Sequence, residues 1–486
     1  MFLLFCIFFQ SANAGPLVVV GSKSFSESVI LAELASQWLE AHDIAVERKF
    51  NLGNTGIAAE ALFQNKISFY PEYSGTLKES LLKIQSEPDY EKALSEKKLR
   101  VTGSLGFENT YALAVPAALA DKLKLGNISD LRAHPELRLG ISHEFSSRAD
   151  GWPGLSRRYA LKFESLSTMA HALSYEAIRT GSVDVIDVYT TDPLIEKLKL
   201  RVLSDEMSYF PKYEALYVGL GNFGPSSDKV WELLNQLQNK ISVEEMIRLN
   251  QAVDIDKKEI PATVEEFLNS KKLGFVKKGA SKGASSEFLL RMKEHLALSL
   301  FSTLFAFLIG MPMGYFAYKI KNLGEVFSLL SALVQTIPSL ALLCLLIPFF
   351  GIGDMPSYIS LFLYALLPIV LNSQLGFQQI SQSHHEVSFA LGLNQRKKFL
   401  WVEFPMAFPL ILNGLHQATI STIGTATLAS FIGGGGLGAY ISSGLATNDL
   451  HIVMKGAVPV TLLALFFHLL FVLIKKYFRQ NKTSAN

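Results

Sequence analysis

Four tyrosines in the N-terminal half of the sequence have side chains that could bind a cation. Tyr73, Tyr111, Tyr189 and Tyr213 lie in loop-like segments near the ends of candidate strands. An aromatic face attracts a cation by ~0.5–2 kcal/mol per good contact, and a quaternary ammonium suits such faces because it cannot donate a hydrogen bond. Ordinary packing is the other role open to each tyrosine. The group predicts a cation site if the fold brings the rings together.

Motifs for covalent, nucleotide or metal chemistry are absent from the sequence. There is no G-x-x-x-x-G-K-[ST] loop, no nucleophile elbow and no metal-spaced cluster of His and Cys. The glycine run 433–438 is not followed by Lys-Ser or Lys-Thr, and His384 and His385 are adjacent rather than four residues apart. The sequence therefore predicts no enzyme, no metal site and no cofactor bound by this chain.

Composition indicates more than one domain and a hydrophobic part. The chain has 486 residues, which are too many for a single core, and 49% of them are hydrophobic while 18% are charged. A formal net charge of +2 gives no reason to expect nucleic acid as a partner. Cys6 and Cys344 both lie in apolar stretches, so the polar half has neither a disulfide nor a cysteine metal site.

The polar half alternates between strand and helix patterns. The clearest helix is 27–40, for which Ser26 is the expected N-cap. Alternation of this kind predicts an α/β domain of two lobes over residues 16–275, with the ligand between the lobes at strand ends. The strand candidates are 17–20, 46–52, 111–115, 137–141, 183–188 and 216–220, and the other helix candidates are 56–65, 121–125 and 168–180.

The C-terminal half is apolar enough to cross a membrane several times. Each of its long apolar stretches approaches the ~20 residues that a helix needs to span a bilayer. They predict an all-α membrane domain of about five helices over 295–478, preceded by a linker rich in Lys, Gly, Ser and Ala at 276–294. The five stretches are 296–318, 325–350, 357–378, 408–431 and 452–474.

The chain start and the loop charges predict the orientation in the membrane. Residues 1–9 are apolar and Ala12-Asn13-Ala14 is a cleavage pattern, so 1–15 is predicted to be a signal peptide that exports the following domain. Lys and Arg gather in the segments that would then be cytoplasmic, at 319–321, 396–398 and 475–482. We expect a multi-pass protein of the cell membrane with its polar domain outside.

One cytoplasmic segment has the pattern of a docking elbow. In EVSFALGLNQRKKFLWVEFP (386–405), a short helix ends at Gly392, and a second helical run, 395–402, ends before Pro405. The segment resembles the EAA loop of ABC-importer permeases, in which Glu386, Gly392 and Pro405 match the fixed positions, while Val387 and Ser388 replace the usual alanines. The resemblance implies that this loop couples the chain to a separate ATPase subunit.

The rest of the chain resembles importers of glycine betaine, carnitine and choline, as a fusion of their binding protein and permease. The resemblance implies that the four tyrosines form a cage for the ammonium and that Lys23, Thr76 and Arg148 donate hydrogen bonds to a carboxylate, with Asp150 and Trp152 supporting Arg148. The matching segments are GSKSFSES (21–28), NLGNT (51–55), YPEYSGT (70–76), ENTYALAV (108–115), GISHEFSSRADGWPGL (140–155), DVIDVYTTDP (184–193), FPKYEAL (210–216), QTIPSLALLCLLIPFFGIG (335–353), LFLYALLPIVLN (361–372) and IGTATLASFIGGGGLG (423–438).

This resemblance implies uptake of a quaternary ammonium betaine across the lipid bilayer. A cytoplasmic ABC ATPase would hydrolyse ATP, and two copies of the membrane half would form the pathway, since five helices make a thin wall. Ergothioneine and other trimethylammonium compounds fit the same cage. A membrane-anchored betaine sensor is the alternative of another class, but it predicts a cytoplasmic output domain, and only ~12 residues follow the last apolar stretch.

Overall fold

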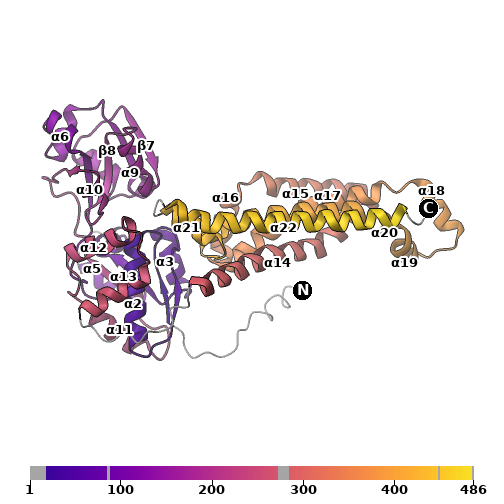
Figure 1. Ribbon diagram of the computed structural model, residues 1–486, viewed down its shortest axis with the longest axis horizontal. Coiled ribbons are helices and arrows are strands. Elements are labelled where there is room, and N and C mark those ends of the chain that lie inside the picture. Colours follow the sequence, from indigo (N-terminus) through magenta and orange to yellow (C-terminus); the bar gives the residue numbers. More distant parts are fainter. Residues whose placement is uncertain (1–17, 85–87, 272–283, 447–448, 484–486) are drawn as a thin grey trace. The chain divides into compact units, whose positions relative to one another are not determined.

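The computed structural model describes residues 18–84, 88–271, 284–446 and 449–483 (Figure 1). The predicted signal peptide and Cys6 lie outside these residues. The described residues form two compact units, of which the first, before residue 272, is rich in sheet and the second, after residue 283, is helical.

The first unit contains two five-stranded sheets, one in each lobe. The first sheet has the order β2-β1-β3-β10-β4, in which β10 runs antiparallel to both of its neighbours. The second has the order β7-β6-β8-β5-β9, in which β5 runs antiparallel to β8 and β9. The strands are β1 (Val18–Gly21), β2 (Val46–Lys49), β3 (Phe69–Tyr73), β4 (Leu99–Val101), β5 (Tyr111–Pro116), β6 (Arg138–Ser142), β7 (Ser165–Met169), β8 (Val185–Tyr189), β9 (Leu200–Val202) and β10 (Ala215–Leu220).

The chain crosses between the lobes twice, once from β4 to β5 and once from β9 to β10. This arrangement confirms the predicted two-lobed α/β fold. Helices cover the sheets, and the apolar face of α2 packs in the core of the first lobe. The longer helices of this unit are α2 (Ser26–Ala41), α3 (Thr55–Phe63), α5 (Pro88–Glu96), α6 (Ala117–Leu123), α8 (Trp152–Arg158), α9 (His171–Arg179), α11 (Ser227–Asn235), α12 (Val243–Asp254) and α13 (Ile260–Ser270), and the shorter elements include α7 (His143–Ser147).

Several local features of this unit differ from the predictions, and besides β3 the strands β4, β7 and β9 were not among the predicted strands. Phe25 rather than Ser26 is the N-cap of α2, and the Ser26 hydroxyl instead donates to Asp254 on α12. The central strand β3 was not predicted, because its sequence FYPEY contains Pro71, which normally marks edge strands, and the charged Glu72. Glu72 is buried there because Lys23 neutralises it.

The second unit is a helical bundle whose tightest packing is between α14, α17 and α20. Gly314 of α14 lies so close to α17 that a Cβ atom there would approach the Cβ of Ser373 to 2.5 Å, a close contact of the kind that small residues permit between membrane helices. The elements are α14 (Ala284–Lys319), α15 (Lys321–Thr336), α16 (Ser339–Phe350), α17 (Asp354–Gln378), α18 (Gln382–Ala390), α19 (Gln395–Lys398), η3 (Phe399–Glu403), α20 (Phe404–Thr425), η4 (Ala426–Ile432), α21 (Gly438–Ala446) and α22 (Leu450–Thr483).

The number of apolar spanning helices is lower than the five predicted. In the described residues, α14, α17 and α22 are long and apolar enough to cross a membrane, and α15 with α16 forms a fourth span only if this pair, bent by 100°, is counted as one. The predicted stretch 408–431 is divided between α20 and η4, and Asn413, His416 and Gln417 make α20 too polar for this criterion.

The first membrane helix also begins earlier than the sequence indicates. Residues 284–294, predicted as part of the linker, belong to α14. Phe288 and Met292 lie one turn apart and pack against the cluster around Leu437 and Val460, which explains why the helix extends through this polar segment.

Candidate binding pocket and coupling loop

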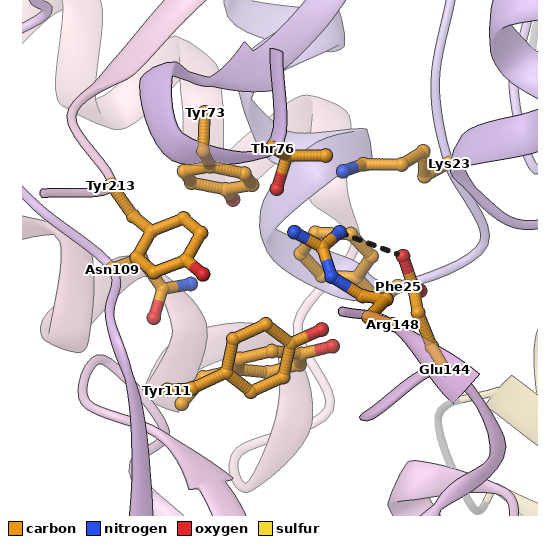
Figure 2. Close-up of a pocket in the computed structure, with 10 residues that line it drawn as sticks. Lys23, Phe25, Tyr73, Thr76, Asn109, Tyr111, Glu144, Arg148 and Tyr213 are labelled. Carbon is orange, nitrogen blue, oxygen red and sulfur yellow. Dashed lines mark hydrogen bonds and ion pairs between the residues drawn. The ribbon is translucent and has the colours of Figure 1, made fainter. Parts of the chain in front are cut away.

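All seven side chains predicted to bind a ligand line one pocket in the first unit (Figure 2). The pocket lies between the two lobes and has an empty volume of about 320 Å³, counting the part open to solvent. The lining residues are Lys23, Phe25, Tyr73, Thr76, Asn109, Tyr111, Glu144, Arg148, Tyr189 and Tyr213.

Strand register brings the tyrosine rings together. Tyr111 begins β5 and Tyr189 ends β8, and the antiparallel pairing places them opposite each other with ring centroids 5.1 Å apart. Tyr213, on the crossing before β10, meets the Tyr111 ring edge-on at 5.8 Å. Tyr73 ends β3 and is paired with Ala215 of β10. The aromatic wall therefore comes from strand ends of both sheets.

Phe25 is a fifth ring that the sequence interpretation missed. The centroid of its ring lies 6.3 Å from that of Tyr73, on which it stacks, and 5.8 Å from that of Tyr189. Phe25 therefore completes the aromatic wall between the two lobes. Its position in the segment GSKSFSES, two residues after the predicted ligand donor Lys23, could have indicated that Phe25 lines the pocket. Asn109 and Glu144 line the pocket as well and were also missed.

The cations of the pocket are held by buried carboxylates. Lys23 Nζ lies 2.6 Å from Glu72 Oε1. Arg148 pairs with Asp150, and its Nη1 lies 3.4 Å from Glu144 Oε1. Burial alone would lower the pKa of Arg148, but the hydrogen bonds to Asp150 raise it above its ordinary value, so the guanidinium stays charged.

Both cations also lie over rings of the aromatic wall. Lys23 Nζ is 5.1 Å from the centroid of Tyr73, and the Arg148 guanidinium carbon is 5.6 Å from that of Tyr111. These contacts are within the range of cation–π attraction. The ring faces are thus already placed to attract positive charge.

The two crossings run side by side next to the pocket. The backbone N–H of Asn109 donates to the carbonyl of Tyr213 at 3.0 Å, and Glu108 pairs with Glu214 in an antiparallel bridge. Asn109 and Tyr213 therefore belong to the hinge and to the pocket wall at the same time. Any rotation of one lobe against the other moves this wall.

Contacts between the lobes surround the same pocket. Thr55 Oγ1 of the first lobe donates to Glu144 Oε1 of the second at 2.8 Å, and the Tyr213 hydroxyl donates to Asp150 at 2.7 Å. Asp150 therefore supports Arg148 as the resemblance implies, whereas Trp152 packs against Phe163. The lobes are joined here by polar contacts, which can break more easily than an apolar interface.

In the second unit, the elbow loop presents an exposed apolar surface. Glu386, Gly392 and Pro405 are all exposed. Gly392 has φ +66°, and its N–H donates to the Phe389 carbonyl, so it ends the helix as predicted. Large apolar side chains are exposed beside these three residues, namely Val387, Phe389, Leu391, Leu400 and Trp401.

The second helical run does not end before Pro405 as predicted. It passes through η3 into α20, where Pro405 lies in the first turn. Pro405 directly follows the π-helical turn η3, where the backbone hydrogen-bond pattern changes, so the proline does not end the helix. The elbow is therefore continuous with α20.

A buried carboxylate that the sequence interpretation missed joins the elbow to α14. Glu403 is 1% exposed, and its carboxylate lies 3.0 Å from Lys319 Nζ and 3.8 Å from Lys398 Nζ. The Tyr315 hydroxyl donates to it at 3.2 Å. The end of α14 and the second half of the elbow thus share one anion.

Comparison with known families assigns both units. Residues 16–270 match the substrate binding domain of ABC-type glycine betaine transport system, and residues 306–483 match the binding-protein-dependent transport system inner membrane component. The first match alone covers more than half of the chain.

The chain is also similar to individual known proteins. The choline transport system permease protein OpuBB of Bacillus subtilis is 38% identical over 180 residues, 37% of this chain and 82% of that protein. The ergothioneine transport permease/ergothioneine binding protein EgtU of Helicobacter pylori is 34% identical over 259 residues, 52% of this chain and 47% of EgtU. A crystal structure of a glycine betaine/carnitine/choline ABC transporter covers 53% of this chain and 99% of its own, with 32% identity and a TM-score of 0.44.

These matches fix the class and the location of the protein. Both parts belong to a transporter, and neither is an enzyme. The helical unit lies in the inner membrane and the binding domain outside the cytoplasm, as the loop charges predicted. The chain belongs to the glycine betaine family of ABC-type importers, with the substrate-binding domain and the inner membrane component on one polypeptide.

Proposed function

We propose that the pocket between the lobes binds a trimethylammonium compound, which the membrane unit then passes into the cell. The observation that carries this proposal is the convergence of Phe25 and four tyrosines, distant in the sequence, on one pocket. Their faces hold the ammonium by cation–π attraction. Betaines such as glycine betaine and carnitine, together with choline, are the cargo class.

The polar side of the pocket binds the other end of a betaine. Lys23, Arg148 and the Thr76 hydroxyl supply hydrogen-bond donors for a carboxylate. Because Glu72, Asp150 and Glu144 already neutralise the two cations, this side offers donors rather than net positive charge. An uncharged hydroxyl, as in choline, can therefore occupy it too.

Ergothioneine is a second candidate cargo. It carries a trimethylammonium, a carboxylate and a ring with an N–H group. Glu144 lines the pocket with 31% of its side chain exposed, and its carboxylate can accept such an N–H. The similarity to EgtU over half of this chain supports testing this compound beside the betaines.

Transport is powered by a separate ATPase chain that docks on the elbow. Glu386, Gly392 and Pro405 shape this loop, and the exposed apolar side chains around them fit a hydrophobic groove of the ATPase. ATP binding and hydrolysis by two such subunits would switch the membrane unit between its outward-facing and inward-facing states. This chain supplies no catalytic residue to that step.

Two copies of the chain form the pathway. Gln417 on α20 and His468 on α22 are exposed on the single bundle, although Gln417 accepts from Asn372 and His468 contacts His416 there. Polar side chains within a membrane normally face protein or water rather than lipid. A second copy, with the pathway between the two bundles, would provide those surroundings.

Calorimetry on the detergent-solubilised full chain tests the proposed cargo class. Glycine betaine, choline, carnitine, proline betaine and ergothioneine would be titrated into the wild type and into a Tyr111→Ala, Tyr189→Ala double variant. We expect binding of at least one compound, lost in the double variant because two ring faces are removed. A folded wild type that binds none of the five would refute the proposed cargo class.

A further inference from the structure

A buried carboxylate lies directly behind the aromatic wall. Glu27, on the first turn of α2, is 3% exposed. The Tyr73 hydroxyl donates to its Oε1 at 2.6 Å and Asn109 Nδ2 donates to the same atom at 2.8 Å. Thr191 Oγ1 and Asn250 Nδ2 donate to Oε2 at 2.6 and 2.8 Å.

These contacts fit an ionised carboxylate. The two amide groups can only donate, and the two hydroxyls can donate as well, so all four partners suit an ionised carboxylate. In the described part of the chain, no lysine, arginine or histidine forms an ion pair with Glu27. Burying a charge without a counter-charge costs free energy, which hydrogen bonds offset in part.

Two of the four donors connect Glu27 to the pocket. Tyr73 and Asn109 both line it, and both bond the same oxygen of Glu27. A hydroxyl that donates to a carboxylate draws electron density onto its own ring and strengthens the attraction of that ring for a cation. The charge of Glu27 therefore acts one side chain away from the place where an ammonium would bind.

We propose that Glu27 is the counter-charge of the cargo: the permanent positive charge of the bound compound completes the ion pair that the empty protein lacks. This inference rests on the proposed function and narrows it. Glu27 touches no ligand and acts through Tyr73 and Asn109, so it is a specificity-determining residue. It selects a cation over an uncharged molecule of the same shape.

The proposal also predicts how binding depends on pH. Burial raises the pKa of Glu27 above its ordinary 4.5, against the four hydrogen bonds that lower it. Protonation would remove the counter-charge, so cation affinity should fall as the pH falls toward this raised pKa. Of the other groups around Glu27, Tyr73 stays neutral in this range, whereas Asp254 on α12 has its pKa raised to about 6 by burial, helped by Asp192 and Glu27. Lys23 Nζ lies 5.1 Å from the centroid of the Tyr73 ring, but its charge is already paired with Glu72.

The test compares choline with its tert-butyl analogue, in which an uncharged carbon replaces the nitrogen. Glycine betaine is compared with its own tert-butyl analogue in the same way. For each pair, calorimetry on the full chain in detergent gives the ratio of the affinity for the cation to the affinity for the analogue. We expect Glu27→Gln to lower the preference for the cation by at least about tenfold, and Tyr73→Phe to lower it partly. Glu33→Gln is the matched control, because Glu33 is a buried carboxylate of the same helix that pairs with Arg48.

A structural role for Glu27 would weaken both compounds equally and leave the ratio unchanged, and that outcome would overturn the proposal. If Glu27→Gln does not fold, the pH dependence of the wild type decides: choline affinity should fall as the pH is lowered from neutral, while that of the analogue stays level. Asp254→Asn should keep this profile. Equal profiles for the two compounds would refute the proposal, whereas no binding of any trimethylammonium compound would refute the proposed function itself.

Discussion

At the residue scale, Phe25 offers the sharpest test of cation–π binding. Leucine at this position keeps most of the apolar volume but has no ring face, so Phe25→Leu should weaken binding of a quaternary ammonium by ~0.5–2 kcal/mol. Phe25→Tyr should bind like the wild type because the face is retained. Calorimetry on the full chain measures both. Equal affinities for all three proteins would mean that the ring contributes only packing.

His171 stabilises the pocket from behind Tyr189. Their ring centroids are 4.3 Å apart, and His171 Nε2 lies 2.9 Å from Asp192. Burial would lower the pKa of His171, but Asp192 and Asp187 raise it to about 10 from 6.5. The folded state therefore binds a proton that the unfolded chain releases near its ordinary pKa.

The sign of this shift gives a prediction. The stabilisation is complete below pH 6.5 and is lost as the pH rises through about 10. His171→Gln should therefore lower the free energy of unfolding of the binding domain by on the order of 3 kcal/mol near neutral pH, and by much less near pH ~10. The melting temperature, measured at both pH values, checks this. His134→Gln is the control, because His134 pairs with an exposed Glu136. A pH-independent deficit would contradict the assignment.

The sequence could predict the pocket residues that have a recognisable type at a recognisable place. The tyrosines stand at strand ends, and Lys23, Thr76 and Arg148 lie in segments with family resemblance. Glu27 could not be found in this way, since an acid in the first turn of a helix normally faces solvent. Its burial depends on donors at positions 73, 109, 191 and 250, which only the folded chain brings together.

At the element scale, Glu403 should couple movements of the elbow loop to movements of α14, because its ion pairs join the two. Glu403→Gln removes the ion pairs to Lys319 and Lys398 but keeps the shape of the side chain. The substitution leaves two partly buried cations without their anion, which destabilises the contact between the elbow and α14. We expect ATP-driven uptake in proteoliposomes to fall at least severalfold, with unchanged cargo affinity.

Two variants separate this role from general damage. Glu325→Gln, an exposed carboxylate of the same unit, should leave uptake unchanged. Combining Glu403→Gln with Lys319→Gln should recover part of the uptake, because one unpaired charge is removed. Full uptake by Glu403→Gln alone would show that the elbow needs no such anchor.

Elements were predictable where one pattern dominates. The alternation of strand and helix patterns predicted the two lobes, and Gly392 predicted the end of α18. β3 was missed because local preference disfavours its proline and its charge, both of which tertiary contacts accept. In the membrane unit, α20 is less apolar than the other long helices because Asn413 and Gln417 lie one turn apart on one of its faces.

At the scale of the whole molecule, we expect two chains in each transporter. Gentle solubilisation with the ATPase present should give a particle containing two copies of this chain and two ATPase subunits, with the exposed Gln417 and His468 covered. Mass measurement in detergent checks this. A particle with one chain that still supports full uptake would contradict the two-copy pathway.

The pocket draws its walls from both lobes and from both crossings between them. We therefore expect a bound molecule to be released when the lobes separate, because that motion breaks its contacts with both walls together. Residence time should then be set by the protein more than by the cargo. Compounds that differ widely in affinity should therefore have similar dissociation rates and differ chiefly in their association rates.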